Sequence, residues 1–69
     1  MKLSNARVTE LATRPGVHTD IAENFLGSMG GLSQSEALAN LELDAQAYGW
    51  NAATGRAIQQ GIMEATEDA

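Results

Sequence analysis

The chain has 69 residues and a net charge of −5, and hydrophobic residues make up 43% of it. This length allows a single domain, residues 1–69, and the hydrophobic content excludes a disordered chain. Because cysteine is absent and no apolar run approaches the roughly 18–20 residues of a membrane span, disulfides, thiolate zinc sites and membrane insertion are excluded, and we predict a cytoplasmic protein.

The first predicted helix covers residues 4–14. Ser4 is suited to cap it, because a serine hydroxyl can accept a hydrogen bond from a free N–H of the first turn. Val8 and Leu11 form a short apolar face. Pro15 disfavours helical backbone at the residue before it, so the helix is expected to end there.

The second predicted helix runs from about residue 19 to residue 29. Ile21, Phe25 and Met29 recur at intervals of four residues, and we predict that they face the core, with Leu26 widening the apolar stripe. The two glycines that follow Met29 are expected to end this helix, since glycine adopts the left-handed cap conformation without a Cβ clash.

The third predicted helix has the strongest start signal. Residues 33–36 read Ser-Gln-Ser-Glu, which is a capping box that satisfies two free N–H groups reciprocally. Leu38, Leu41 and Tyr48 then follow at helical spacing. Gly49 is expected to end the helix in the left-handed conformation.

The fourth predicted helix begins near Asn51 and runs to about Glu64, with Ile58 and Ile62 on its apolar face. Residues 66–69 are predicted to be a frayed tail. The connection at Gly49 is short, so the last two helices are predicted to form an antiparallel hairpin. The predicted fold is an all-α bundle of three to four short helices.

Two glycines fall within the fourth predicted helix. Gly55 and Gly61 each cost roughly 1 kcal/mol relative to alanine in a helix interior. Glycine at such a position can allow another helix to approach closely. The alternative for Gly55 is that the first turn begins later, at Thr54.

Charge is unevenly distributed along the chain. No lysine or arginine occurs between residues 15 and 55. The acidic residues of this stretch are Asp20, Glu23, Glu36, Glu42 and Asp44. Such a stretch disfavours phosphate backbones and favours a basic protein surface, although a solvated acidic exterior is the simpler interpretation. Residues 32–57 can be read as a helix-turn-helix, but the second helix offers only Arg56 as a cation, so we predict no direct nucleic-acid binding.

The residue inventory argues against catalysis. His18 is the single histidine, and without a set of partner residues it is interpreted as an exposed loop residue. No nucleophile-elbow motif and no EF-hand spacing is present. We therefore predict that the chain is not an enzyme and that it has no catalytic, cofactor-binding or metal-binding residues.

The most informative local feature is the aromatic corner at residues 48–50. Tyr48 and Trp50 flank Gly49, and tyrosine and tryptophan are enriched at the energetic centres of interfaces. The alternative is that Trp50 completes the core. We predict a protein-binding site made of Tyr48 and Trp50, with Glu42 and Asp44 as steering charges.

Residues 26–31, Leu-Gly-Ser-Met-Gly-Gly, followed by Ala37 and Leu38, resemble part of the ubiquitin-associated domains, which are small three-helix bundles. The resemblance covers only a short part of the chain, about twenty residues. It departs from the family at Gly31, where a large apolar residue is expected, and the spacing to Ala37 is one residue too long. Because the missing residue would contact ubiquitin, that function is not carried over.

Three hypotheses for the function follow. The first is a small acidic regulatory or inhibitory protein that binds another protein, of the sort that phages and mobile elements encode. Twelve of the 69 residues are alanine, so the core is thin, and a homo-oligomer is predicted as a route to further burial. The second is a nucleic-acid mimic that inhibits a basic nucleic-acid-binding protein. The third is a structural subunit of a larger assembly.

Overall fold

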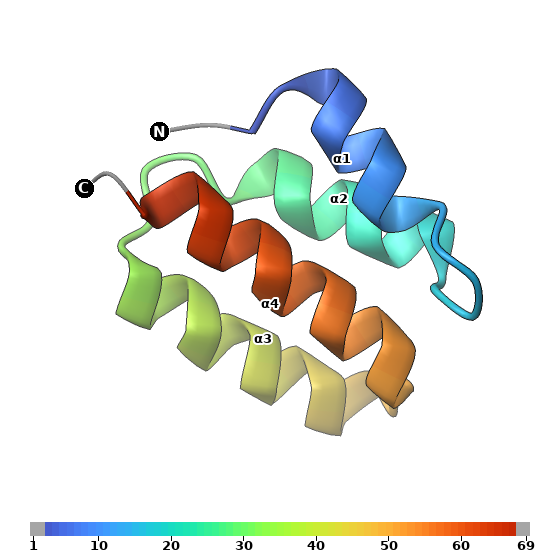
Figure 1. Cartoon of the computed structure of the whole chain (residues 1–69). Helices are drawn as coiled ribbons and strands as arrows, with labels where there is room; N and C mark the ends of the chain where they lie inside the picture. Colours follow the sequence, from blue (N-terminus) through green and yellow to red (C-terminus); the bar gives the residue numbers. More distant parts are fainter. Residues whose placement is uncertain (1–2, 68–69) are drawn as a thin grey trace.

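The computed structural model describes residues 3–67, and these residues form four helices and no strand (Figure 1). The helices are α1 (Asn5–Ala12), α2 (Thr19–Ser28), α3 (Gln34–Tyr48) and α4 (Ala52–Thr66). α3 and α4 run antiparallel and lie side by side, as Figure 1 shows. The predictions of an all-α bundle and of a terminal hairpin are therefore confirmed.

The predicted start signals act as local hydrogen bonds. The Ser4 hydroxyl accepts from the Arg7 N–H at 3.2 Å. The capping box of α3 is complete, because the Ser33 hydroxyl accepts from the Glu36 N–H at 3.2 Å and the Glu36 carboxylate accepts from the Ser33 N–H at 3.0 Å. The hydrogen bond that the Ser33 backbone N–H donates stabilises the charged carboxylate and, with a further contribution from the Ser33 side chain, lowers the pKa of Glu36.

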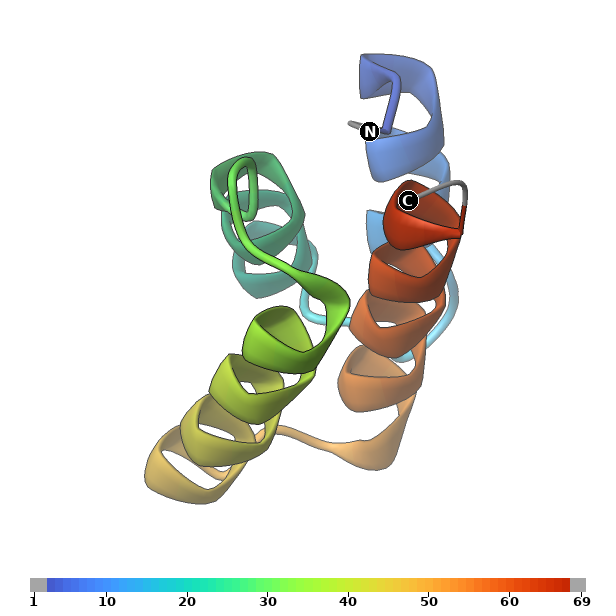
Figure 2. The ribbon, with the colours of Figure 1, turned by 90° about the vertical axis from the view of Figure 1, so that its left-hand side faces the viewer.

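Helix α4 is the centre of the bundle. It contacts α1, α2 and α3, whereas α3 contacts no other described helix (Figure 2). The buried residues of α4 are Thr54, Ala57, Ile58, Gly61, Ile62 and Ala65. Four of these six residues are alanine, glycine or threonine, so the neighbouring backbones can come close to the axis of α4.

At Gly61, side chains of two neighbouring helices pack directly on the backbone of α4. A Cβ atom at this position would overlap a terminal methyl group of Leu26 on α2 and lie 3.3 Å from Cδ1 of Leu11 on α1. The expectation that a glycine of this helix admits a close neighbour is therefore met at Gly61. At Gly55 a Cβ would meet no atom within 4 Å, and α4 begins before it, at Ala52.

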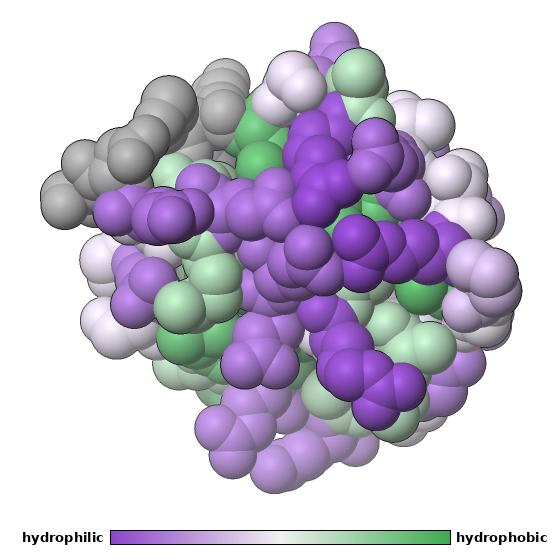
Figure 3. Space-filling view, viewed as in Figure 1, coloured by the Kyte–Doolittle hydropathy of each residue, from purple (hydrophilic) through white to green (hydrophobic). Residues whose placement is uncertain are grey.

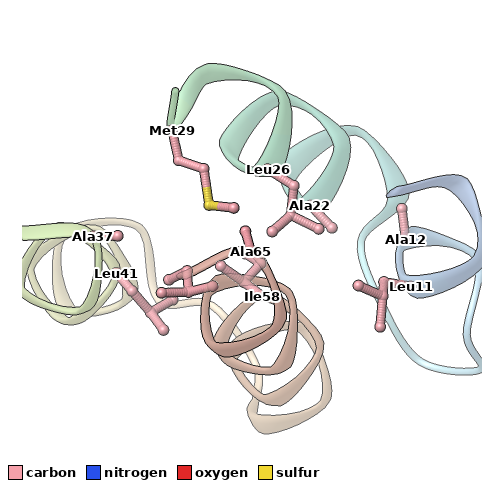
Figure 4. Close-up of a cluster of buried hydrophobic side chains, with 10 residues drawn as sticks. Leu11, Ala12, Ala22, Leu26, Met29, Ala37, Leu41, Ile58 and Ala65 are labelled. Atoms are coloured by element: carbon pink, nitrogen blue, oxygen red, sulfur yellow. The ribbon is translucent and has the colours of Figure 1, made fainter. Parts of the chain in front are cut away.

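The core differs from the predicted one in the orientation of α2. Ala22, Leu26 and Met29 are its buried side chains and point toward the other helices, as Figure 4 shows. Leu26 and Met29 are buried as predicted, whereas Ile21 and Phe25 are only half-buried and pack against the edge of the core, so the prediction was wrong for these two residues. Packing explains the difference, because Leu26 occupies the space above Gly61, and Ile21 and Phe25 then lie at the edge of the core.

A polar network joins α1 to α4. The Arg7 guanidinium donates to both carboxylate oxygens of Glu64, from Nε at 2.8 Å and from Nη2 at 2.6 Å. Gln60 donates to the same carboxylate at 3.0 Å and accepts from Arg14 at 2.6 Å. Hydrophilic side chains cover much of the face on which α1 and α4 lie in front, as Figure 3 shows. The hydrogen bonds from Arg7 lower the pKa of Glu64 to about 2.

The α1–α2 loop is attached to the start of α4. Asn51 caps α4 by accepting from the Thr54 N–H at 2.8 Å, and its amide donates to the Gly16 carbonyl at 2.9 Å. The buried Thr54 hydroxyl accepts from the backbone N–H of His18 at 2.9 Å. The backbone N–H of His18 therefore attaches the loop to α4, although His18 is exposed.

Helix α4 extends two residues beyond the predicted Glu64. Its last residue is Thr66, whose hydroxyl donates to the Ile62 carbonyl at 2.7 Å and accepts from the Gln34 amide at 3.1 Å. Thr66 thus belongs to the helix, although it was included in the predicted frayed tail. Residues 68–69 of that tail lie outside the described residues.

The two glycines of α4 are expected to respond in opposite ways to alanine. Gly55→Ala should raise the free energy of unfolding by roughly 0.5–1 kcal/mol, because alanine is the better helix former and the site is open. Gly61→Ala should lower it by about 1–2 kcal/mol, because the clash with Leu26 exceeds that gain. Urea unfolding followed by circular dichroism measures both. Equal stabilisation by the two substitutions would show that α2 does not pack closely on Gly61.

The Glu64 carboxylate should make the stability depend on pH at low pH. Its pKa of about 2 lies below the ordinary 4.5, so its contribution is complete above about 4.5 and is lost as the pH falls through 2. Glu64→Gln should therefore lower the urea midpoint at pH 7 and differ little from the parent at pH 2. Glu23→Gln, which removes an exposed carboxylate on α2, is the control. A deficit of Glu64→Gln that is the same at both pH values would contradict the assignment.

Candidate functional site

An open groove of about 470 Å³ lies between α2 and α3. Its lining residues are Ile21, Asn24, Phe25, Ser28, Asp44, Tyr48 and Trp50. The groove exists because both helices pack on α4 while their backbones do not come close to each other. Its volume is in the range of sites that accept small ligands or a few side chains of a partner.

Helix α2 supplies one wall of the groove. Ile21, Asn24, Phe25 and Ser28 are spaced as i, i+3, i+4 and i+7, which places them on one face of a helix. This face is open because Ala22 and Leu26 hold the adjacent face against the core. Sequence reasoning missed this wall: it assigned Ile21 and Phe25 to the core, although the spacing of the four residues was visible in the sequence.

The three aromatic residues of the chain form a continuous row along the groove. The ring of Phe25 meets that of Trp50 edge-on at a centroid distance of 6.0 Å. Trp50 in turn stacks on Tyr48 at 6.4 Å with an interplanar angle of 18°. Such arrangements are the favourable geometries for aromatic pairs. Phe25 and Trp50 are half-buried, and Tyr48 at the end of the row is 74% exposed.

Trp50 combines the two alternatives that the sequence left open for it. It is half-buried and packs against the core cluster, yet it also lines the groove. It is an edge residue of the core with one side turned to the open surface. Whether a partner contacts it stays a prediction.

The corner that carries Tyr48 and Trp50 is held by its backbone. Gly49 has a φ of 65°, a left-handed conformation that a residue with a Cβ adopts at a cost. The Trp50 N–H then donates to the Ala45 carbonyl at 3.1 Å, and Asn51 caps the next helix. The connection is therefore fixed on both sides, and little conformational entropy remains to be lost on binding.

The structure brings together three of the four predicted site residues. Asp44 lines the groove one helical turn before Tyr48, and Trp50 lines the same groove and stacks on Tyr48. Glu42 is exposed and does not line the groove. It lies two residues before Asp44, which on an α-helix is nearly the opposite side.

The lining of the groove carries one acidic residue, Asp44, and no basic residue. All its lining residues fall within the stretch of residues 15–55, which has no lysine or arginine. Arg7 and Arg14 are held at the α1–α4 network by Glu64 and Gln60. Both of these arginines therefore form their hydrogen bonds away from the groove.

A second hollow of about 420 Å³ lies near the ends of α1, α2 and α4. Its lining consists of apolar residues, glycines and two uncharged polar residues, Asn5 and Thr66. Because it holds no titratable side chain, it offers no acid–base or metal chemistry.

Residues 3–67 contain no cluster of three or more histidine, cysteine, aspartate or glutamate side chains that could hold a metal ion. Within the same range, no helix has the length and apolar character needed to cross a membrane. Comparisons with protein-family models, with curated proteins and with solved structures find no significant match, so the local resemblance of residues 26–38 to ubiquitin-associated domains gains no support from them.

Alanine substitutions of Trp50 and Tyr48 should show how much each side chain contributes to the stability of the fold. Trp50→Ala should lower the free energy of unfolding by roughly 1–3 kcal/mol, less than for a fully buried aromatic because Trp50 is half-buried. Tyr48→Ala should change it by no more than about 0.5 kcal/mol, since the side chain is mostly in solvent. Denaturant unfolding measures both. Equal losses in the two variants would mean that Tyr48 is part of the core.

Proposed function

We propose that this chain is a small acidic regulatory or inhibitory protein that acts by binding another protein through the groove between α2 and α3. The supporting observation is the row of three aromatic rings that leads from the core edge at Phe25 to the exposed ring of Tyr48. Aromatic side chains at a concave surface bury a large area on binding and carry much of the energy of protein interfaces.

The composition of the groove supports a protein partner. Its lining combines the apolar residues Ile21, Phe25 and Trp50 with the polar residues Asn24, Ser28 and Asp44. Protein interfaces likewise combine aromatic and apolar contacts with a limited number of polar groups. The fixed corner at Gly49 keeps the ordering cost of binding low, so a larger part of the contact energy appears as affinity.

The proposed mode of action is occlusion of a partner's surface. The polar groups of the groove are an amide, a hydroxyl and one carboxylate, and the Ser28 hydroxyl already donates to the Phe25 carbonyl at 3.1 Å. These groups can form hydrogen bonds or an ion pair with the side chains of a partner. The nucleic-acid-mimic hypothesis is less well supported, because Glu36 is engaged in its capping box and Glu42 and Asp44 lie on different sides of α3.

Self-association is a separate proposal and would use a different surface. Two copies meeting groove to groove would bring their Asp44 carboxylates together without a cation between them. Leu43 and Met63 are exposed large apolar residues outside the groove and are better candidates for a contact between copies. The structural-subunit hypothesis would require the same outer surface.

Site-specific photocrosslinking tests the proposed function. A benzophenone amino acid placed at Tyr48 should crosslink to a protein partner in cells of the natural host. The same group at Gln59, an exposed residue of α4 that does not line the groove, is the matched control. We expect a defined adduct from position 48 that is absent from position 59. No adduct at 48, or identical adducts at both positions, would refute binding through the groove.

A further inference from the structure

We infer that the groove recognises a lysine or arginine side chain of its partner, held between Asp44 and the ring of Tyr48, together with a neighbouring apolar side chain that packs on Phe25 and Ile21. The occupant is thus a basic, partly apolar segment of another protein. This inference rests on the proposed function and specifies the chemistry of the partner.

The first step is the geometry of Tyr48. One face of its ring stacks on Trp50 at 6.4 Å, while the side chain as a whole is 74% exposed, so the other face is open. The face of an aromatic ring carries negative electrostatic potential and attracts an ammonium or guanidinium group. Tyr48 therefore offers a surface on which a cation can lie.

The second step is the position of Asp44. It lies one helical turn before Tyr48, so the two side chains are neighbours on the same face of α3. Asp44 is partly buried, and the ion pairs among residues 3–67 are formed by Arg7 with Glu10 and with Glu64. Its carboxylate thus has no cationic partner within the described part of the chain. A guanidinium over the Tyr48 ring would be within reach of it.

The third step is charge complementarity. The stretch of residues 15–55 that contains the groove has acidic residues and no lysine or arginine. A neutral apolar occupant would remove water from the Asp44 carboxylate and replace it with nothing, which is unfavourable. A second copy of this chain would add a further carboxylate. A basic occupant compensates the desolvated charge and is attracted by the acidic surface before contact.

The fourth step is the apolar side of the groove. Ile21 and Phe25 are half-buried on α2, across from Asp44 on α3. A groove of about 470 Å³ has room for a few side chains projecting from a partner. The occupant therefore presents a cation toward α3 and a large apolar side chain toward α2.

Selection from a random 12-residue peptide display library against the intact chain tests this inference directly. We expect the enriched peptides to carry lysine or arginine beside a large apolar residue. Asp44→Asn should weaken the selected peptide by about tenfold, and Tyr48→Ala by a similar factor. Glu42→Gln is the control for charge, because it lies on the same helix outside the groove, and it should change affinity less than about twofold. Circular dichroism establishes that each variant is folded.

The outcomes separate this inference from the proposed function. Replacing the peptide's cationic residue by norleucine should reduce binding as much as Asp44→Asn does. If neither change weakens binding, or if the library yields only neutral or acidic peptides, the cation site is refuted, while a specific photocrosslink at Tyr48 would still uphold a protein-binding groove. If neither peptides nor a crosslink are obtained, both proposals fail.

Discussion

Close packing of two helices on Gly61 is the contact on which the rest of the structure depends. Leu26 and Leu11 fill the space that a side chain at this position would occupy. Because α4 presents mostly small residues at its buried face, three helices can converge on it with short separations. The high alanine content is therefore compatible with a packed core: small side chains allow backbones to approach, and dispersion contacts replace part of the missing apolar area.

The same contact determines where the groove is. With Leu26 placed over Gly61, the face of α2 that carries Ile21 and Phe25 is turned away from α4 and toward the side of α3. α3 reaches the bundle only through α4, so it does not cover this face. Trp50 closes one end of the gap by meeting Phe25 edge-on. The open aromatic surface is thus a consequence of how the small residues pack.

The sequence predicted the features that local chemistry controls. The capping box at Ser33, the cap at Asn51 and the left-handed Gly49 need only nearby residues, and all three occur as expected. The orientation of α2 could not be obtained in this way, because Ile21 and Leu26 are equally apolar and only the position of Gly61 on another helix decides between them. Tyr48 and Trp50 were predicted as site residues because the corner between them depends on nearby residues. The α2 wall of the groove was missed because it depends on packing against another helix.

The pairing of charged residues also differs between the two sides of the molecule. On the α1–α4 side, Arg7 is paired with Glu64, which lowers the pKa of that carboxylate and leaves little charge to attract a partner. On the α2–α3 side the chain has no lysine or arginine to pair with its carboxylates. Carboxylates without a paired cation attract positively charged groups, and this is the attraction on which the proposed binding mode relies. The stretch without lysine or arginine also contains every lining residue of the aromatic groove, so in the proposed binding mode attraction and anchoring would act at the same place.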